Sequence, residues 1–145
     1  MEKPPAPFVN TSDHYEQSSA ESNGGFRGGV LLPDGRVLFV PLYADRIVLY
    51  DPIEDKLSKG KDDLSKYAGK YAGGVLLPDG KVVLVPTSTD HVGLYDPIED
   101  KWIASTSVSD GSYSCGVPLP DGRVALDPLT HTSVVHSTSI YLTVY

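Results

Sequence analysis

The chain has 145 residues, enough for one ordinary domain with a hydrophobic core, and it carries a formal net charge of −7. This balance argues against nucleic-acid binding, which needs Lys and Arg gathered on one face, whereas the basic residues here lie scattered, mostly beside predicted turns. No apolar run approaches the roughly eighteen residues that a membrane span requires. We therefore expect a soluble protein that binds neither nucleic acid nor membranes.

Residues 1–23 are rich in proline and then in polar residues, and no apolar periodicity is present there. They predict a flexible arm, with a short strand near Tyr15 as the rival interpretation. The first residues lack the charged-then-apolar progression of a secretory signal. The single cysteine, Cys115, cannot form an intrachain disulfide and fits a reducing compartment. We expect a cytoplasmic or otherwise intracellular location.

Residues 24–145 contain an internal repeat with an offset of about 45 residues. We place the three copies at about 24–68, 69–110 and 111–145, as one repeat domain. In the first copy, residues 30–32 predict a short strand, and Pro33-Asp34-Gly35 predicts a hairpin turn, because proline presets φ and glycine accepts a positive φ. Residues 36–40 follow as a strand that is apolar on both faces, which indicates that sheets cover it on both sides.

The rest of each copy predicts two further strands. In the first copy these are residues 46–50 and a weak strand from residue 56, separated by the acidic turn 51–55. In the second copy Trp102 opens a clearer outer strand at 101–106. In the third copy, residues 133–135 predict the third strand and residues 140–145 the fourth, from their alternation.

Cys115 stands where the other two copies have Gly28 and Gly73. We interpret it as a small residue that faces a crowded backbone. A nucleophilic thiol is the alternative, but no basic residue sits at a fixed nearby spacing to activate it.

The stretch 95–102, Tyr-Asp-Pro-Ile-Glu-Asp-Lys-Trp, followed by Leu-Pro-Asp-Gly-Arg-Val at 119–124, resembles a kelch-type repeat. In that family a Tyr-Asp-Pro turn precedes a Trp-led outer strand and a Gly-bearing hairpin. The paired glycines here come before the first strand of each unit rather than after the second, so the resemblance is kelch-like. It implies an all-β fold, a β-propeller-like array of about three four-stranded blades.

Three blades fall short of the four to eight that close a propeller, because each blade buries its faces only against its neighbours. Three explanations stand open: two chains complete a ring as a homodimer, the chain is part of a longer protein, or it is a decayed remnant. The two-sided apolar strands favour the first two, so we expect a protein partner or self-association.

The acidic turns Asp51/Glu54/Asp55 and Asp96/Glu99/Asp100 offer oxygen ligands for calcium, but they lack a calcium-loop spacing and are interpreted as ordinary turns. A His/Asp couple at Asp90 and His91 is a weak candidate for acid–base work, because His91 aligns with Arg46 and Ser133. His136 aligns with leucines and is interpreted as partly buried. We predict no catalytic residue, no metal and no cofactor.

The loop after the second strand varies most between copies, and variable loops on a repeated scaffold are where recognition usually resides. The predicted contact residues are Tyr43, Asp45, Arg46, Thr87, Asp90, His91 and His131. We therefore predict a non-catalytic protein-interaction or structural module. The alternatives are an enzyme or carbohydrate-binding domain with its site at the central channel, or a non-functional fragment of a longer repeat protein.

Overall fold

A computed structural model of the chain describes residues 25–65, 71–108, 113–128 and 140–143. The described residues form three antiparallel sheets and no helix. The first sheet contains β1 (Phe26–Leu31), β2 (Val37–Pro41), β3 (Val48–Asp51) and β4 (Lys56–Lys59). The second contains β5 (Tyr71–Leu76), β6 (Val82–Pro86), β7 (His91–Asp96) and β8 (Lys101–Ser107), and the third contains β9 (Tyr113–Pro118), β10 (Arg123–Pro128) and β11 (Ile140–Thr143).

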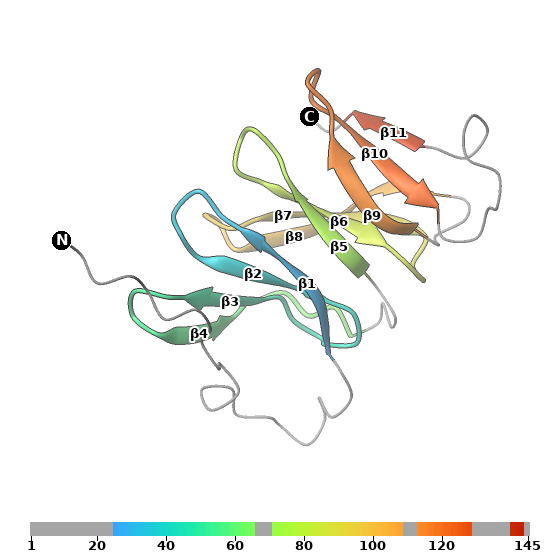
Figure 1. The fold of residues 1–145 in the computed structure, drawn as a ribbon. Helices are drawn as coiled ribbons and strands as arrows, with labels where there is room; N and C mark the ends of the chain where they lie inside the picture. Colours follow the sequence, from blue (N-terminus) through green and yellow to red (C-terminus); the bar gives the residue numbers. More distant parts are fainter. Residues whose placement is uncertain (1–24, 66–70, 109–112, 129–139, 144–145) are drawn as a thin grey trace.

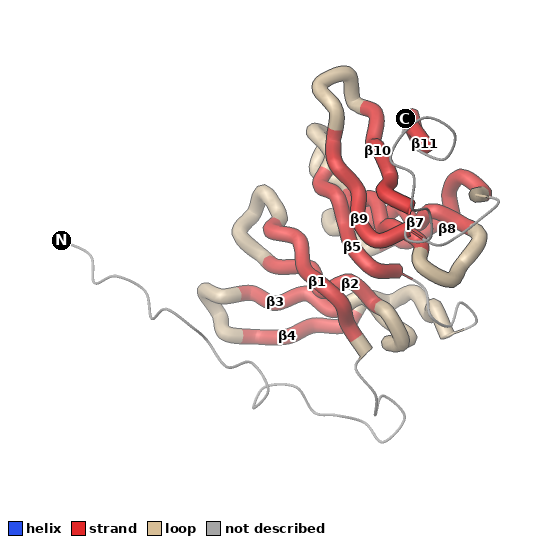
Figure 2. The backbone as a smooth tube through the Cα atoms, turned by 45° about the vertical axis from the view of Figure 1, so that its right-hand side comes forward, coloured by secondary structure: helices blue, strands red, loops and turns tan. Residues whose placement is uncertain are grey.

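We call these sheets blade 1, blade 2 and blade 3, and they stack side by side in chain order (Figure 1). The first strands of the blades form the inner edge of the stack, where β5 contacts both β1 and β9. The β1–β2 and β3–β4 hairpins, with their counterparts in the other blades, lie at one end of the strands, which we call the hairpin end (Figure 2). The β2–β3 and β6–β7 loops and residues 60–65 lie at the other, which we call the loop end.

The core consists of two apolar layers, one on each face of blade 2. Along β6, Val82 and Leu84 belong to the layer shared with blade 1, while Val83 and Val85 belong to the layer shared with blade 3. All four side chains are fully buried, at 0 % exposure. In β6 a strand that is apolar on both faces is thus covered on both sides. The prediction was made for residues 36–40, and there it holds for one face only, because Leu38 and Val40 are buried whereas Val37 and Phe39 are half-buried. Blade 2 is the only one of the three with a described neighbour on each face.

Each first hairpin closes by the same local chemistry. In blade 1, Gly35 has a φ of 90° and donates its N–H to the Leu32 carbonyl at 3.0 Å. The Asp34 carboxylate accepts the Arg36 backbone N–H at 3.0 Å. Gly80 and Gly122 have φ values of 89° and 87° at the same place in blades 2 and 3. The Pro-Asp-Gly turn prediction is therefore confirmed, with glycine at the position that needs a positive φ.

The second hairpin, between β7 and β8, is held by an aspartate at its last residue. Asp100 adopts a φ of 52°, and its carboxylate accepts the Tyr95 hydroxyl proton at 2.7 Å. Asp96 caps the same turn by accepting the backbone N–H groups of Ile98 and Glu99. Tyr50 and Asp55 repeat the hydroxyl–carboxylate bond in blade 1 at 2.8 Å. These carboxylates are thus used in turn structure.

Replacing Tyr95 with phenylalanine is expected to reduce the amount by which the free energy of unfolding falls at alkaline pH. Burial, and then the hydrogen bond to Asp100, raise the pKa of the Tyr95 phenol above its ordinary value of 10.0. A raised folded-state pKa contributes stability that is present below pH 10 and is lost as the pH rises above it, by up to about 1.4 kcal/mol per pH unit. Urea denaturation of both proteins between pH 8 and pH 11 measures the two slopes. Identical slopes would contradict this assignment.

The segment from residue 60 to residue 64 ties blade 1 to blade 2. Its Lys61 backbone N–H bonds the Asp100 carboxylate at 3.0 Å, and the Asp62 carboxylate accepts the Trp102 backbone N–H at 2.7 Å. Leu64, at the end of the segment, is fully buried in the layer between the two blades. The connection is therefore part of the core packing.

Three sequence predictions are corrected by the structure. Strand β1 begins at Phe26 rather than residue 30, because the Gly28–Gly29 pair lies inside the strand at a bulge in the pairing with β2. β11 pairs directly with β10, so residues 140–143 take the third place in blade 3 and not the fourth. Cys115 is exposed rather than packed against crowded backbone, since its face of blade 3 has no described neighbour. The predicted arm at 1–23 and the predicted strand at 133–135 lie outside the described residues.

Candidate functional site

Among the predicted contact residues at the loop end, Tyr43 is the one with a large apolar surface in solvent, at 62 % exposure. Its loop is held by the Gly25 carbonyl, which accepts the backbone N–H groups of Leu42, Tyr43 and Ala44. The Tyr43 ring is therefore presented on a fixed backbone. This is the property expected of a contact residue on a recognition loop.

Arg46 performs a structural task at the same end. Its guanidinium donates to the carbonyl oxygens of Gly60 at 3.1 Å and Lys61 at 2.9 Å, and so holds the connection between blades 1 and 2. Asp45 contributes its backbone carbonyl, which accepts the Leu64 N–H at 2.7 Å. These two predicted residues therefore support the connecting segment as well as bordering the loop.

His91 and Asp90 form a local pair in blade 2, with 2.6 Å between the His91 Nδ1 and an Asp90 carboxylate oxygen. The Asp90 side chain is exposed, and its backbone carbonyl accepts the Val108 N–H. Thr87 is half-buried at the start of the same loop. The structure thus pairs Asp90 with His91 and places Thr87 at the start of their loop, whereas His131 lies outside the described residues.

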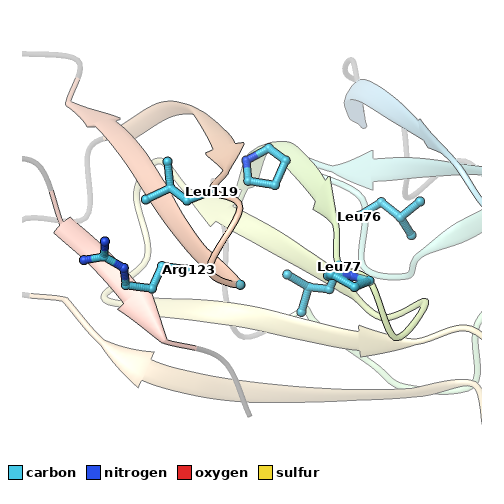
Figure 3. A pocket seen from close by; sticks show the side chains of 7 residues that line it. Leu76, Leu77, Leu119 and Arg123 are labelled. Carbon is cyan, nitrogen blue, oxygen red and sulfur yellow. The ribbon is translucent and has the colours of Figure 1, made fainter.

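A groove that sequence reasoning did not single out lies at the opposite, hairpin end. It has a volume of about 300 Å³ and lies between the first hairpins of blades 2 and 3. Leu76 and Leu77 line it from blade 2, and Leu119 and Arg123 from blade 3 (Figure 3). Pro78, Pro118 and Gly122 complete the lining. This volume is at the lower end of the range for small-ligand sites.

The charge at the rim of the groove is balanced. Arg123 Nε bonds the Asp121 carboxylate at 2.7 Å, and the Arg123 backbone N–H bonds the same carboxylate at 3.1 Å. The backbone hydrogen bond, followed by the side-chain one, holds the pKa of Asp121 below its ordinary value. Asp121 therefore stays ionised at neutral pH, and the groove presents an apolar floor beside a neutral, hydrogen-bonding ion pair.

Exposed aliphatic side chains are concentrated at the hairpin end. Ile53 and Ile98, at the tips of the second hairpins, are each 88 % exposed, and Leu31, at the end of β1, is 66 % exposed. Exposed apolar residues scattered singly are ordinary, whereas several at the end of the molecule that also carries an apolar groove form a candidate contact surface. The sequence signal was the repeated isoleucine in each acidic turn, which was interpreted only as part of the turn.

The described residues contain no group of three or more potential metal ligands, and none of them forms a helix long and apolar enough to cross a membrane. In the acidic turns, Asp51 and Asp96 direct their carboxylates to backbone N–H groups of their own hairpins. These oxygens are therefore engaged in capping the turns rather than converging on a common point.

Comparison with solved structures identifies the fold. The chain is similar to virginiamycin B lyase from Staphylococcus aureus, with a TM-score of 0.60 and 16 % identity over 71 % of this chain and 34 % of that one. It is also similar to Kuenenia stuttgartiensis hydrazine synthase, with a TM-score of 0.59 and 16 % identity over 83 % of this chain and 33 % of that one. An auxiliary nutrient binding protein from Bacteroides ovatus has a TM-score of 0.56 and 14 % identity over 70 % of this chain and 25 % of its own.

These likenesses show that the chain is all-β and β-propeller-like, as the repeats predicted. The chain spans about a third or less of the length of these three proteins. No protein-family model and no curated protein sequence matches it.

Proposed function

We propose that this propeller-like array is a non-catalytic binding module that takes an extended apolar segment of a protein partner at its hairpin end. One observation supports this most directly: the groove between the Pro-Asp-Gly hairpins of blades 2 and 3 lies at the same end as the exposed Leu31, Ile53 and Ile98. Burying such side chains against an aliphatic segment is favourable by about 25 cal/mol per Å². We include the kelch-like turn at 95–102 in this proposal, because Ile98 is exposed at its tip.

The chemistry of the groove indicates the kind of segment that fits. Leucine and proline side chains form its walls, and the neutral Arg123–Asp121 pair offers hydrogen bonds at one side without a net charge. In blade 1 the corresponding arginine, Arg36, bonds Asp34 and also donates to the backbone carbonyl of Pro97 at 3.3 Å.

A reaction site at the inner edge of the stack has less support. Apart from tyrosines, the ionisable side chains on the inner strands β1, β5 and β9 are Arg27 and Cys115. General acid–base or nucleophilic catalysis needs a pair of such groups within hydrogen-bond reach. The similar structures include both a lyase and a nutrient binding protein, so the propeller-like fold accommodates either role.

A library of displayed random peptides selected on the immobilised full chain tests the proposal. We expect enrichment of peptides with aliphatic side chains, and at least about tenfold weaker binding to the double variant Pro78→Glu/Pro118→Glu, because carboxylates in an apolar groove remain unpaired. Pro33→Glu is the matched control at the corresponding hairpin of blade 1, where Pro33 is exposed. Peptides that lose binding to Tyr43→Asp instead would move the site to the loop end. No enriched peptide, or binding unchanged by all variants, would contradict the proposal.

A further inference from the structure

The outer face of blade 1 has the same pattern of apolar residues as the face of blade 2 that packs against blade 1. The strand pairings place four apolar residues of blade 1 on this face, in the same register as four residues of blade 2. Those four residues of blade 2 belong to the apolar layer shared with blade 1 or pack against it. We define the blade 1 outer face by Leu31, Val37, Phe39 and Tyr50, which correspond to Leu76, Val82, Leu84 and Tyr95. Leu31 is exposed, and Val37 and Phe39 are only half-buried. Tyr50 is buried, at 7 % exposure. The surface that is core in blade 2 is thus partly open in blade 1.

A glycine in each inner strand indicates what belongs on this face. A side chain on Gly74 would have its Cβ 2.6 Å from Val30 of blade 1, and a Cβ on Gly116 would lie 2.8 Å from Val75 of blade 2. In both cases the glycine makes room for a valine of the preceding blade. The third member, Gly29, is exposed, and the three atoms nearest to a Cβ there belong to its own sheet, the nearest at 3.2 Å. Blade 1 therefore keeps the gap that a preceding blade fills.

The outer face of blade 3 offers a surface of the required kind. We define it by Val117, Leu119, Ala125 and Asp127, which correspond to the buried residues Val75, Leu77, Val83 and Val85 of blade 2. The two residues nearest the hairpin keep their identities, and Val117 is 56 % exposed. The two positions that change are a smaller residue, Ala125, and an acid, Asp127.

The smaller residue of blade 3 is matched by a larger residue on the blade 1 outer face. Ala125 is smaller than its counterparts Leu38 and Val83, whereas Phe39 is larger than its counterparts Leu84 and Leu126. A short side chain opposite a long one conserves the volume of a packed layer. The sizes of the side chains on the two outer faces are therefore complementary.

The charges match as well. Between blades 2 and 3, a Cβ on Gly73 would lie 3.7 Å from the Ser114 carbonyl and 3.9 Å from the Cys115 Cα. The same packing between blade 3 and a following blade 1 places Cys115 beside Arg27 and Gly28. The Asp127 carboxylate is already at this spot, 3.8 Å from the Cys115 Sγ and 3.3 Å from the Ser114 hydroxyl. Arg27 is exposed, and it stands where the other blades have Ala72 and Ser114. At the two positions that would meet, blade 3 has an acidic residue and blade 1 a basic one, where the other blades have uncharged residues.

We propose that the blade 3 outer face of one molecule packs against the blade 1 outer face of a second copy of this chain, in the arrangement by which blade 1 covers blade 2. Two such contacts related by a twofold axis join six blades, within the four to eight that close a propeller. The partner is a second copy, because the size change at Phe39 and Ala125 and the charges at Arg27 and Asp127 complement each other within one sequence. Leu31 and Leu119 contribute both to this contact and to the surface at the hairpin end, whereas Pro78 and Pro118 belong to neither outer face, so variants at these prolines separate the two proposals.

Charge reversal tests the proposed contact. Arg27→Glu and Asp127→Lys are each expected to raise the dissociation constant of the dimer by at least about tenfold, because each places like charges opposite one another. The double variant restores the opposite pair and is expected to recover most of the affinity. Sedimentation velocity of the full chain measures the constants, and circular dichroism melts check that each variant is folded. A dimer that neither single variant weakens, or a double variant that is the weakest of the three, would overturn the proposed register.

A disulfide test distinguishes the remaining arrangements. With Arg27→Cys, mild oxidation is expected to link the new thiol to the native Cys115 of a second copy, giving a dimer on non-reducing gels. Adding Cys115→Ser should abolish this crosslink. A crosslink that survives Cys115→Ser would show blade 1 faces meeting each other and would overturn the proposal. Folded wild-type protein that stays monomeric at all concentrations, together with the absence of a crosslink in the Arg27→Cys variant, would also overturn it and would leave the face for a blade of another chain.

Discussion

Replacing Gly93 with valine is expected to lower the free energy of unfolding by about 3 kcal/mol, which shifts the melting temperature of a domain of this size by roughly 10 °C. Gly93 is buried in β7, and a Cβ there would lie 2.8 Å from the Trp102 Nε1 and 2.9 Å from the end of the Tyr71 ring. Tyr71 is fully buried and cannot move aside without disturbing the layer between blades 1 and 2. The higher strand propensity of valine offsets only a small part of this cost.

Blade 1 provides the control for this prediction. At the position of Gly93 it has Val48, which is buried, and at the position of Trp102 it has Leu57. Trp102→Leu should therefore remove one of the two close contacts, and the double variant should be more stable than the sum of the two single effects predicts. Urea denaturation of the four proteins at one concentration completes the cycle. Additive effects would show that the rings of blade 2 do not require the glycine.

Replacing Leu84 with alanine is expected to cost 2–5 kcal/mol, about the range for truncating a buried leucine to alanine. Leu84 is fully buried in the layer between blades 1 and 2. Leu126, the corresponding residue of blade 3, is 2 % exposed, and its truncation should cost about as much. Both layers are predicted to contribute to one cooperative transition, monitored by circular dichroism in urea.

Phe39, the corresponding residue of blade 1, is the informative control. It is half-buried, so Phe39→Ala in the monomer is expected to cost less than Leu84→Ala. If a second copy covers this face, the cost of Phe39→Ala should increase with protein concentration, while that of Leu84→Ala should not. Equal costs for Phe39→Ala and Leu84→Ala in dilute protein would contradict the assignment of Phe39 to an open face.

The repeated residues made the architecture predictable, because each turn residue and each apolar alternation acts locally. Pro33, Asp34 and Gly35 specify a hairpin without reference to the rest of the chain, and a β6 strand that is apolar on both faces already requires two neighbours. The place of residues 140–143 was not predictable, because it depends on which strand pairs with β10. Alternation indicates a strand but carries no information about its partner.

The candidate site was less predictable than the fold. The groove between Pro78 and Pro118 exists only because two hairpins lie side by side. The sequence of each hairpin alone predicts a turn and nothing more. In the same way, Arg46 was predicted as a contact residue from the variability of its loop, and its bonds to the Gly60 and Lys61 carbonyls depend on a connection fourteen residues further along the chain. Contacts between repeats, unlike the turns within them, are not encoded in local sequence.

Light scattering of the purified, unmodified full chain across a concentration series is the most direct test of whether the open blade faces meet. We predict that the mass rises from the 15.6 kDa of one chain to twice that value and then stays constant, as expected for two copies that close a ring. A folded particle with the mass of one chain at every concentration up to about 100 μM would contradict this assembly. A mass that keeps rising past two chains would show head-to-tail packing that does not close, and would contradict the twofold ring.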